Sequence, residues 1–149
     1  MLFQLFFHFS DCEGALQLDV ISNNLGDNDG LVHNVLSSDE SEWLVDEEST
    51  GDQGFILRTR GCTRKITGFR IQNAAVPHAT KSFRVSGASE FNGGWNNLSE
   101  GNFEEDSLSV TFHLNQPVEV RFVKFELLSS NGGRGGGLQS FTLTTGIVD

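Results

Sequence analysis

The sequence is short of several residue types, and each shortage excludes a class of protein. Its 149 residues contain no tyrosine, two prolines and two cysteines. The cysteines, Cys12 and Cys62, are far apart, and there is no CxxC pair or Cys/His spacing of the kind that binds zinc. A zinc site is therefore not expected. The two cysteines could form one disulfide or remain two free thiols, and the sequence alone leaves both open.

Basic residues are scarce relative to acidic ones. The chain has 10 Lys and Arg against 20 Asp and Glu, a formal net charge of -10. Such a field repels a phosphate backbone, so no nucleic-acid partner is expected. Anionic lipid headgroups are disfavoured for the same reason. The expected loops offer only Leu25 and Val76 as apolar tips, so insertion into a membrane is not expected either.

Long hydrophobic runs are also absent. No run of 18 apolar residues occurs, and the apolar start "MLFQLFFHF" is too short to span a bilayer. It lacks the basic residues and the cleavage site of a signal peptide. We assign residues 1–14 to an N-terminal apolar segment, which forms a first strand or packs on a partner, and residues 15–149 to one domain. The compartment is left open.

Catalytic motifs are missing as well. The chain has no GxSxG, no HExxH and no GxGxxG after a strand. The glycine-rich stretch "NGGRGGGL" (131–138) leads into a strand and carries no GK[ST], so it is a turning loop and no phosphate cradle. The sequence therefore predicts a protein that is not an enzyme.

What is present is a series of short stretches in which apolar and polar residues alternate, the pattern of half-buried strands. They lie at 15–21, 54–60, 65–71, 82–85, 107–114, 118–127 and 138–145. A short helical turn is possible within 31–43, and no long helical pattern occurs. Strands at such short spacing predict an all-β fold, an antiparallel β-sandwich. The polar connections at its ends are expected to present binding residues; they lie at 22–33, 45–53, 72–80, 88–106 and 128–137.

Two stretches predict side-chain directions in detail. In 107–114, Leu108, Val110, Phe112 and Leu114 are expected to point inward. In 118–127 the alternation changes phase at Phe122-Val123, which suggests a bulge or a strand buried on both faces. Most aromatic residues of the strands are expected in the core, namely Phe55, Phe69, Phe83, Phe112, Phe122, Phe125 and Phe141, together with Trp43. Trp95 is expected to pack at a sheet edge.

Four blocks of sequence, in this order, resemble the discoidin domain. They are "NVLSSDESEW" (34–43), "RKITGFRIQN" (64–73), "FRVSGASEFNGGW" (83–95) and "VRFVKFELLSSNGGRGGGLQSFTL" (120–143). This is the coagulation factor V/VIII type C family of the galactose-binding-like superfamily. The chain departs from the family pattern at "TRG" (59–61), where the family has "DLG". It also has no cysteine after Cys62 to close the disulfide that commonly joins the ends of these domains.

The resemblance implies a jelly-roll-like, galactose-binding-like sandwich whose loops at one end bind a ligand without catalysis. Members recognise carbohydrates, phospholipid headgroups or proteins, often at cell surfaces, which favours an extracellular location. The expected partner is a glycan or glycoprotein. The alternative is a protein-interaction subunit of a larger, intracellular assembly.

By the same resemblance, the candidate ligand-binding residues are polar residues of the loops: His33, Asn73, His78, Asn131 and Arg134. Asn73 has an alternative role, since its amide could cap the end of a strand through the neighbouring backbone. Loop 128–137 contains no aromatic residue on which a sugar could stack. No cofactor is required. Some members hold a structural calcium, for which Asp39 is the candidate ligand, although the last strand offers Gln139 and Ser140 in place of a carboxylate.

Overall fold

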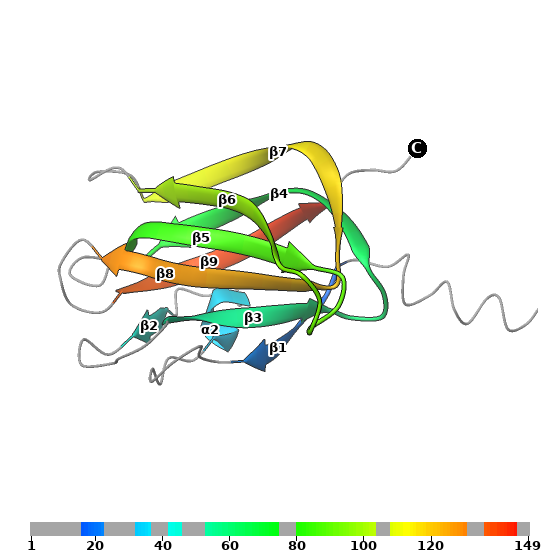
Figure 1. Cartoon of the computed structure of the whole chain (residues 1–149). Helices are drawn as coiled ribbons and strands as arrows, with labels where there is room; N and C mark the ends of the chain where they lie inside the picture. The colour runs from blue at the N-terminus through cyan, green and yellow to red at the C-terminus, as the bar shows by residue number, and fades with distance from the viewer. Residues whose placement is uncertain are drawn as a thin grey trace, which may run out of the picture.

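The computed structural model describes residues 16–22, 32–36, 42–45, 53–74, 80–103, 108–130 and 136–145. Two antiparallel sheets face each other (Figure 1). The first sheet has the strand order β1 (Leu18–Ser22), β3 (Gln53–Thr59), β8 (Phe122–Ser130), β5 (Thr80–Ala88) and β6 (Asn96–Asn102). The second has the order β2 (Trp43–Val45), β9 (Gly136–Thr145), β4 (Arg64–Asn73) and β7 (Ser109–Val120). The predicted antiparallel β-sandwich is confirmed.

One short helix, α2 (His33–Leu36), packs against β9 and confirms the helical turn expected within 31–43. Among the residues that the structure describes, no helix is long and apolar enough to cross a membrane. The apolar segment 1–14 lies outside these residues, so its assignment stays a prediction.

Two strands escaped the sequence analysis. β6 lies inside the stretch 88–106, which was expected to be one long loop. Its side chains are exposed or half-buried throughout, because it is an edge strand of its sheet, and so it shows no clear alternation. β2 has three residues, Trp43–Val45, and is not among the strands that the sequence predicted. A strand this short carries too few residues for a period-two pattern.

The phase change at Phe122-Val123 marks neither a bulge nor a doubly buried strand. The chain leaves one sheet and enters the other there: β7 ends at Val120, and β8 begins at Phe122 in the facing sheet. Arg121 between them donates its backbone N–H to the Ala88 carbonyl and accepts a bond from the Thr59 N–H. The first residues of the expected strand 118–127 therefore belong to β7, which continues to Val120, and the rest belong to β8.

The core is built from stacked and edge-on aromatic rings between the two sheets. Trp43 is fully buried and meets Phe55 at a centroid distance of 5.1 Å. The predicted core residues Phe55, Phe69, Phe83, Phe125 and Phe141 are buried, and Phe112 packs against them half-buried. Two expectations were wrong. Leu108 is 67% exposed because it precedes β7 at the rim, and Phe122 lies on the outer face of its sheet, half-buried.

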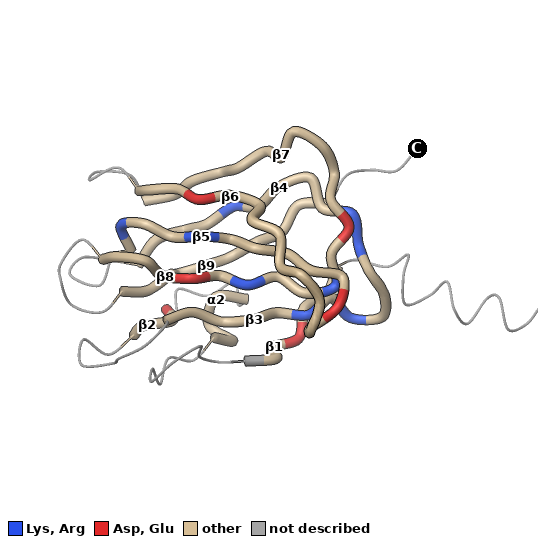
Figure 2. The backbone as a smooth tube through the Cα atoms, viewed as in Figure 1, with Lys and Arg blue, Asp and Glu red and all other residues tan. Residues whose placement is uncertain are grey.

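The two ends of the sandwich differ in their connections (Figure 1). The strands that segments 46–52, 75–79, 104–107 and 131–135 join meet those segments at one end, here called the loop end. The opposite end, here called the turn end, carries the connections 60–63 and 89–95 and the single residue Arg121. Among the described residues, many of the charged ones lie toward the turn end (Figure 2). Its basic residues at the strand ends are Arg58, Arg60, Arg64, Lys65, Arg121 and Lys124.

The turn end also contains a cysteine, Cys62. Cys62 lies in the connection between β3 and β4, and it is disulfide-bonded. The alternative of two free thiols is therefore excluded. The backbone carbonyl of Cys62 accepts a hydrogen bond of 2.6 Å from the Thr59 hydroxyl, which fixes this connection to the end of β3.

Candidate functional site

Asn73 closes the base of a loop at the loop end. It is the last residue of β4 and is only 5% exposed. Its amide oxygen accepts bonds from the backbone N–H groups of Ala74 and Thr80, at 2.9 and 2.8 Å. Its amide nitrogen donates to the Thr80 carbonyl at 2.9 Å. These bonds hold together the two ends of segment 74–80, which carries His78.

Thr80 ties a second loop to the same point. Its hydroxyl donates a 2.6 Å hydrogen bond to the Gly137 carbonyl, and Thr80 pairs with Ser130 across the sheet. Ser130 and Gly136 flank the segment 131–135, which carries Asn131 and Arg134. The roots of the two candidate ligand-binding loops therefore lie side by side, and buried polar side chains fix them. We call Asn73, Thr80 and Gly137 the loop-end clasp.

The predicted site residues fall into two groups. His33 opens α2 and is exposed, and Asn73 is buried within the clasp. The other candidates lie outside the described residues: His78, Asn131, Arg134 and Asp39. Their meeting in one pocket therefore stays a prediction. For Asn73, the hydrogen bonds match the alternative that the sequence left open, because its amide binds neighbouring backbone.

The residues that the structure describes do not build a calcium site. No group of three or more His, Cys, Asp or Glu among them could hold a metal ion. β9 presents Gln139 and Ser140, whose side chains carry no carboxylate. Hard cations such as Ca²⁺ are held by several oxygen ligands, usually including carboxylates. Calcium binding through Asp39 stays a prediction, since Asp39 is not among the described residues.

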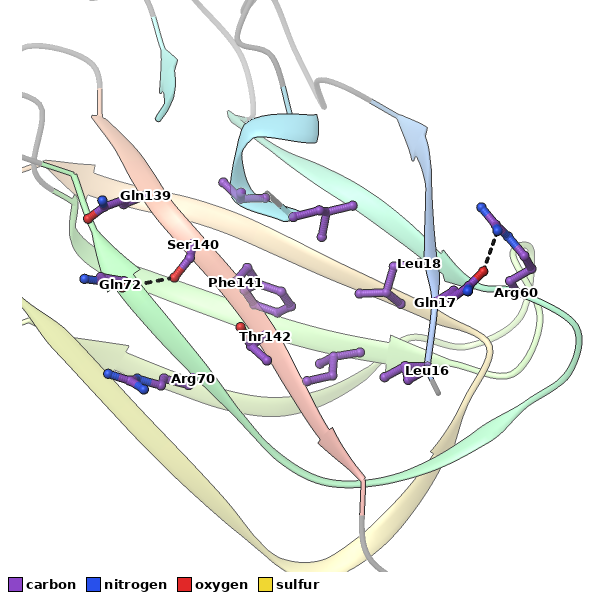
Figure 3. Close-up of a pocket in the computed structure, with 13 residues that line it drawn as sticks. Leu16, Gln17, Leu18, Arg60, Arg70, Gln72, Gln139, Ser140, Phe141 and Thr142 are labelled. Carbon is purple, nitrogen blue, oxygen red and sulfur yellow. Dashed lines mark hydrogen bonds between the residues drawn. The ribbon is translucent and has the colours of Figure 1, made fainter. Parts of the chain in front are cut away.

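A groove of about 940 Å³ opens along one side of the sandwich (Figure 3). It is lined by residues of β1, β4 and β9, and α2 covers one end. Phe141 and Leu18 supply apolar walls, and Arg70, Gln72 and Ser140 supply polar ones. The Ser140 hydroxyl donates a 3.4 Å bond to the Gln72 side-chain oxygen. Neither His33 nor Asn73 is among the residues that line the groove, and sequence patterns cannot locate it, because it depends on how segments far apart in the sequence come together.

Near the turn-end side of the groove, two arginines form ion pairs with one acidic residue, Asp19. The Arg60 guanidinium donates to an Asp19 carboxylate oxygen at 2.7 Å and to the Gln17 side chain. Arg58 contributes a longer ion pair of 3.5 Å to the same carboxylate. Hydrogen bonding from Arg60 is the main cause that lowers the pKa of Asp19 below its ordinary value of 3.8.

Comparison with known proteins identifies the family. The sequence model of the F5/8 type C domain matches residues 20–140, so the chain belongs to the F5/8 type C, or discoidin, family. This confirms the resemblance on which the site residues were chosen. A search of curated protein sequences returned no match.

Several solved structures with the same fold are carbohydrate-binding modules. One is CpGH89CBM32-5 from Clostridium perfringens in complex with GalNAc-β-1,3-galactose, with a TM-score of 0.69 and 16% identity over 87% of this chain and 95% of that one. Another is the family 32 module of C. perfringens NanJ in complex with galactose, with a TM-score of 0.68 and 14% identity over 86% and 92%. A third, from Streptococcus pneumoniae EndoD, has a TM-score of 0.66 and 14% identity over 87% and 96%. At these identities the likeness establishes the galactose-binding-like fold.

Proposed function

We propose that this domain is a non-catalytic carbohydrate-binding module that holds a glycan with its loop end. The observation that carries the proposal is the loop-end clasp. Asn73 and Thr80 bind the roots of segments 75–79 and 131–135 to one another, so both segments leave the sandwich at one place. Loops on a rigid scaffold are the usual carriers of binding residues.

The residues of these loops suit a sugar ligand. His78, Asn131 and Arg134 together supply donors and an acceptor, which vicinal hydroxyl groups require. Asn73 acts as a positioning residue beneath them, and exposed His33 on α2 completes the candidate set. The structural relatives were crystallised with galactose and with GalNAc-β-1,3-galactose, which supports a galactose-type ligand. The net charge of -10 favours neutral glycans over sialylated or sulfated ones.

The absence of catalysis is part of the proposal. One of the structural relatives, CBM32-3 of Clostridium perfringens, comes from a family 31 glycoside hydrolase. The described residues contain no cluster of metal ligands. The paired carboxylates of a glycosidase would have to be 5–10 Å apart, roughly, and face one cleft. Among the described residues, no Asp or Glu lines the groove of Figure 3.

The test is binding of the intact chain to a glycan array that includes neutral galactose- and GalNAc-terminated structures. We expect binding in calcium and in EDTA alike, because no cofactor is required. His78→Ala and Arg134→Ala should each weaken binding by about tenfold or more, the effect of roughly 1.4 kcal/mol from lost hydrogen bonds. Lys81→Ala, an exposed change beside the clasp, is the control and should bind as the native chain does. A folded chain that binds no glycan would refute the proposal and favour the protein-interaction alternative.

A further inference from the structure

A cluster of aromatic side chains lies on the surface of the turn end. Phe91 contacts Trp95 at a centroid distance of 6.4 Å and Phe122 at 5.5 Å, and both rings stand steeply to it, at 79° and 70°. The Lys124 ammonium sits over the Trp95 ring, 4.5 Å from its centroid. We call Phe91, Trp95 and Phe122 the turn-end cluster. It accounts for the outward position of Phe122, which the sequence had assigned to the core.

Phe91 is the exposed member of this cluster. It lies at the centre of a tight turn, in which the Gly93 N–H donates a 3.0 Å bond to the Glu90 carbonyl. Its side chain is 45% exposed, whereas most other phenylalanines in the described part of the chain are buried. A single exposed apolar side chain is common on protein surfaces, but a ring left open to solvent beside two other aromatic rings is a feature that calls for an explanation. Binding of a ligand is the explanation that the geometry supports.

The size of the cluster limits the ligand. One aromatic side chain buries about 150–250 Å² when fully covered, and these three rings are already partly covered by one another. They offer far less than the roughly 800 Å² per partner of a stable protein interface. Lys124 already occupies a face of Trp95, so Phe91 has the most accessible ring. A ligand about the size of one ring fits this surface.

Polar groups around the cluster indicate the chemistry of that ligand. Asn92, Asn96 and Asn97 are all exposed and flank the rings in "FNGGWNN". Amide side chains both donate and accept hydrogen bonds, which suits neighbouring hydroxyl groups and gives no preference for an anion. A pyranose has this combination, an apolar C–H face that packs on an aromatic ring and a rim of hydroxyls.

We propose that the turn-end cluster is a second sugar-binding surface, with Phe91 as the platform for a neutral pyranose and the flanking asparagines as hydrogen-bonding partners. It shares no residue with the loop-end site and lies at the opposite end of the sandwich (Figure 1). Loop 128–137 has no aromatic ring on which a sugar could stack. Phe91 would supply such a ring, but at the opposite end of the sandwich. A chain with two such surfaces can hold two sugars at once, and the gain in avidity needs no new contact.

The test uses the two indole N–H signals of the ¹⁵N-labelled intact chain, titrated separately with galactose, N-acetylgalactosamine, glucose and mannose. Trp95 is half-exposed in the cluster, and Trp43 is fully buried and serves as the internal reference. We expect at least one sugar to move the Trp95 signal with a millimolar Kd while the Trp43 signal stays in place. Phe91→Ala should weaken this binding by about tenfold or more. Trp95→Phe assigns the two signals.

Two further variants separate this inference from the proposed function. The double variant His78→Ala, Arg134→Ala removes loop-end candidates and should leave the Trp95 shift unchanged. Leu128→Ala removes an exposed apolar side chain of similar exposure, 47%, from the other end of β8, and it should also leave the shift unchanged. A Trp95 signal that stays in place with all four sugars would overturn the inference. So would a dimer that dissociates on Phe91→Ala, since a second copy would then be the occupant.

Discussion

The two ends of this sandwich are held in different ways. At the loop end, buried polar side chains anchor the loops. Thr80 is fully buried, Asn73 is 5% exposed, and each bonds to the backbone of neighbouring segments. At the turn end, the buried Thr59 hydroxyl bonds to the Cys62 carbonyl within one connection, and exposed ion pairs around Asp19 accompany a few backbone hydrogen bonds. Unpaired buried groups are costly, while exposed ion pairs contribute little. The loop end, where buried side chains join two separate loops, is therefore the end whose anchors should matter most.

The largest effect is expected from a glycine in the clasp. A Cβ at Gly137 would lie 2.3 Å from the Trp43 carbonyl oxygen, a backbone atom of the paired strand β2. Gly137→Ala should therefore push β2 from β9 and lower the free energy of unfolding by about 3 kcal/mol. Denaturant unfolding followed by circular dichroism measures this difference.

The matched change at the turn end is Gly94→Ala. A Cβ at Gly94 meets nothing within 4 Å, and this glycine has no left-handed backbone. We expect the free energy of unfolding of Gly94→Ala to stay within about 0.5 kcal/mol of that of the native chain. Equal losses in the two variants would contradict the difference between the ends.

A smaller loss is expected when the clasp loses its amide. Asn73→Ala leaves the backbone N–H groups of Ala74 and Thr80 and the Thr80 carbonyl without their partner. The free energy of unfolding should fall by about 2–3 kcal/mol, which lowers Tm by roughly 5–10 °C. Glycan binding should weaken as well, because the roots of both loops would lose their fixed positions.

Its neighbour Gln72 provides the control. Gln72 is half-buried, and its side chain makes only one long bond, to Ser140. Gln72→Ala should cost less than about 1 kcal/mol and leave glycan binding unchanged. If Asn73→Ala were as mild as Gln72→Ala, the clasp would have no anchoring role.

The smallest effect is expected from acid at the turn end. Arg60 lowers the pKa of Asp19 below 3.8, so the folded state binds this proton less readily than the unfolded state does. The stabilisation is fully present above the unfolded value of 3.8 and is lost as pH falls through the lowered pKa of the folded chain. Thermal melts over a range of pH should show that Asp19→Asn has a slightly lower Tm than the native chain near neutral pH. This difference in Tm should disappear as pH falls below the pKa of Asp19 in the folded chain, and high salt should reduce it too. A difference in Tm that grows in acid would show that Asp19 does not stabilise the fold through its ion pairs.

The sequence predicted those parts of the fold in which one face of a strand is buried. Phe55 and Leu57 in β3 and Phe83 and Val85 in β5 alternate clearly, and they are buried as expected. β6 was missed because an edge strand with solvent beside it does not need a repeating apolar side. Phe122 was misplaced because alternation shows only that two residues face opposite ways, and it cannot tell which side is covered.

The site was less accessible to sequence analysis. Asn73 was selected as a polar residue at a strand end, and its alternative capping role followed from its chemistry. Its partnership with Thr80 joins the two ends of a loop, and the bond from Thr80 to Gly137 joins residues 57 positions apart. The turn-end cluster likewise joins Phe91, in the connection 89–95, to Phe122, the first residue of β8. Contacts of this kind depend on which strands pair, and no local pattern records them.

The described chain begins and ends at the same side of the sandwich. Gln17 bonds to Arg60, and Thr145 pairs with Ile66, both near the turn end. A solid support coupled to an exposed side chain here, such as that of Gln17 or Thr145, would therefore leave the loop end facing outward. The same attachment would crowd Phe91 and its neighbours. A chip that uses these positions would then report the loop-end surface and hide the other, so a solution measurement is needed to see both.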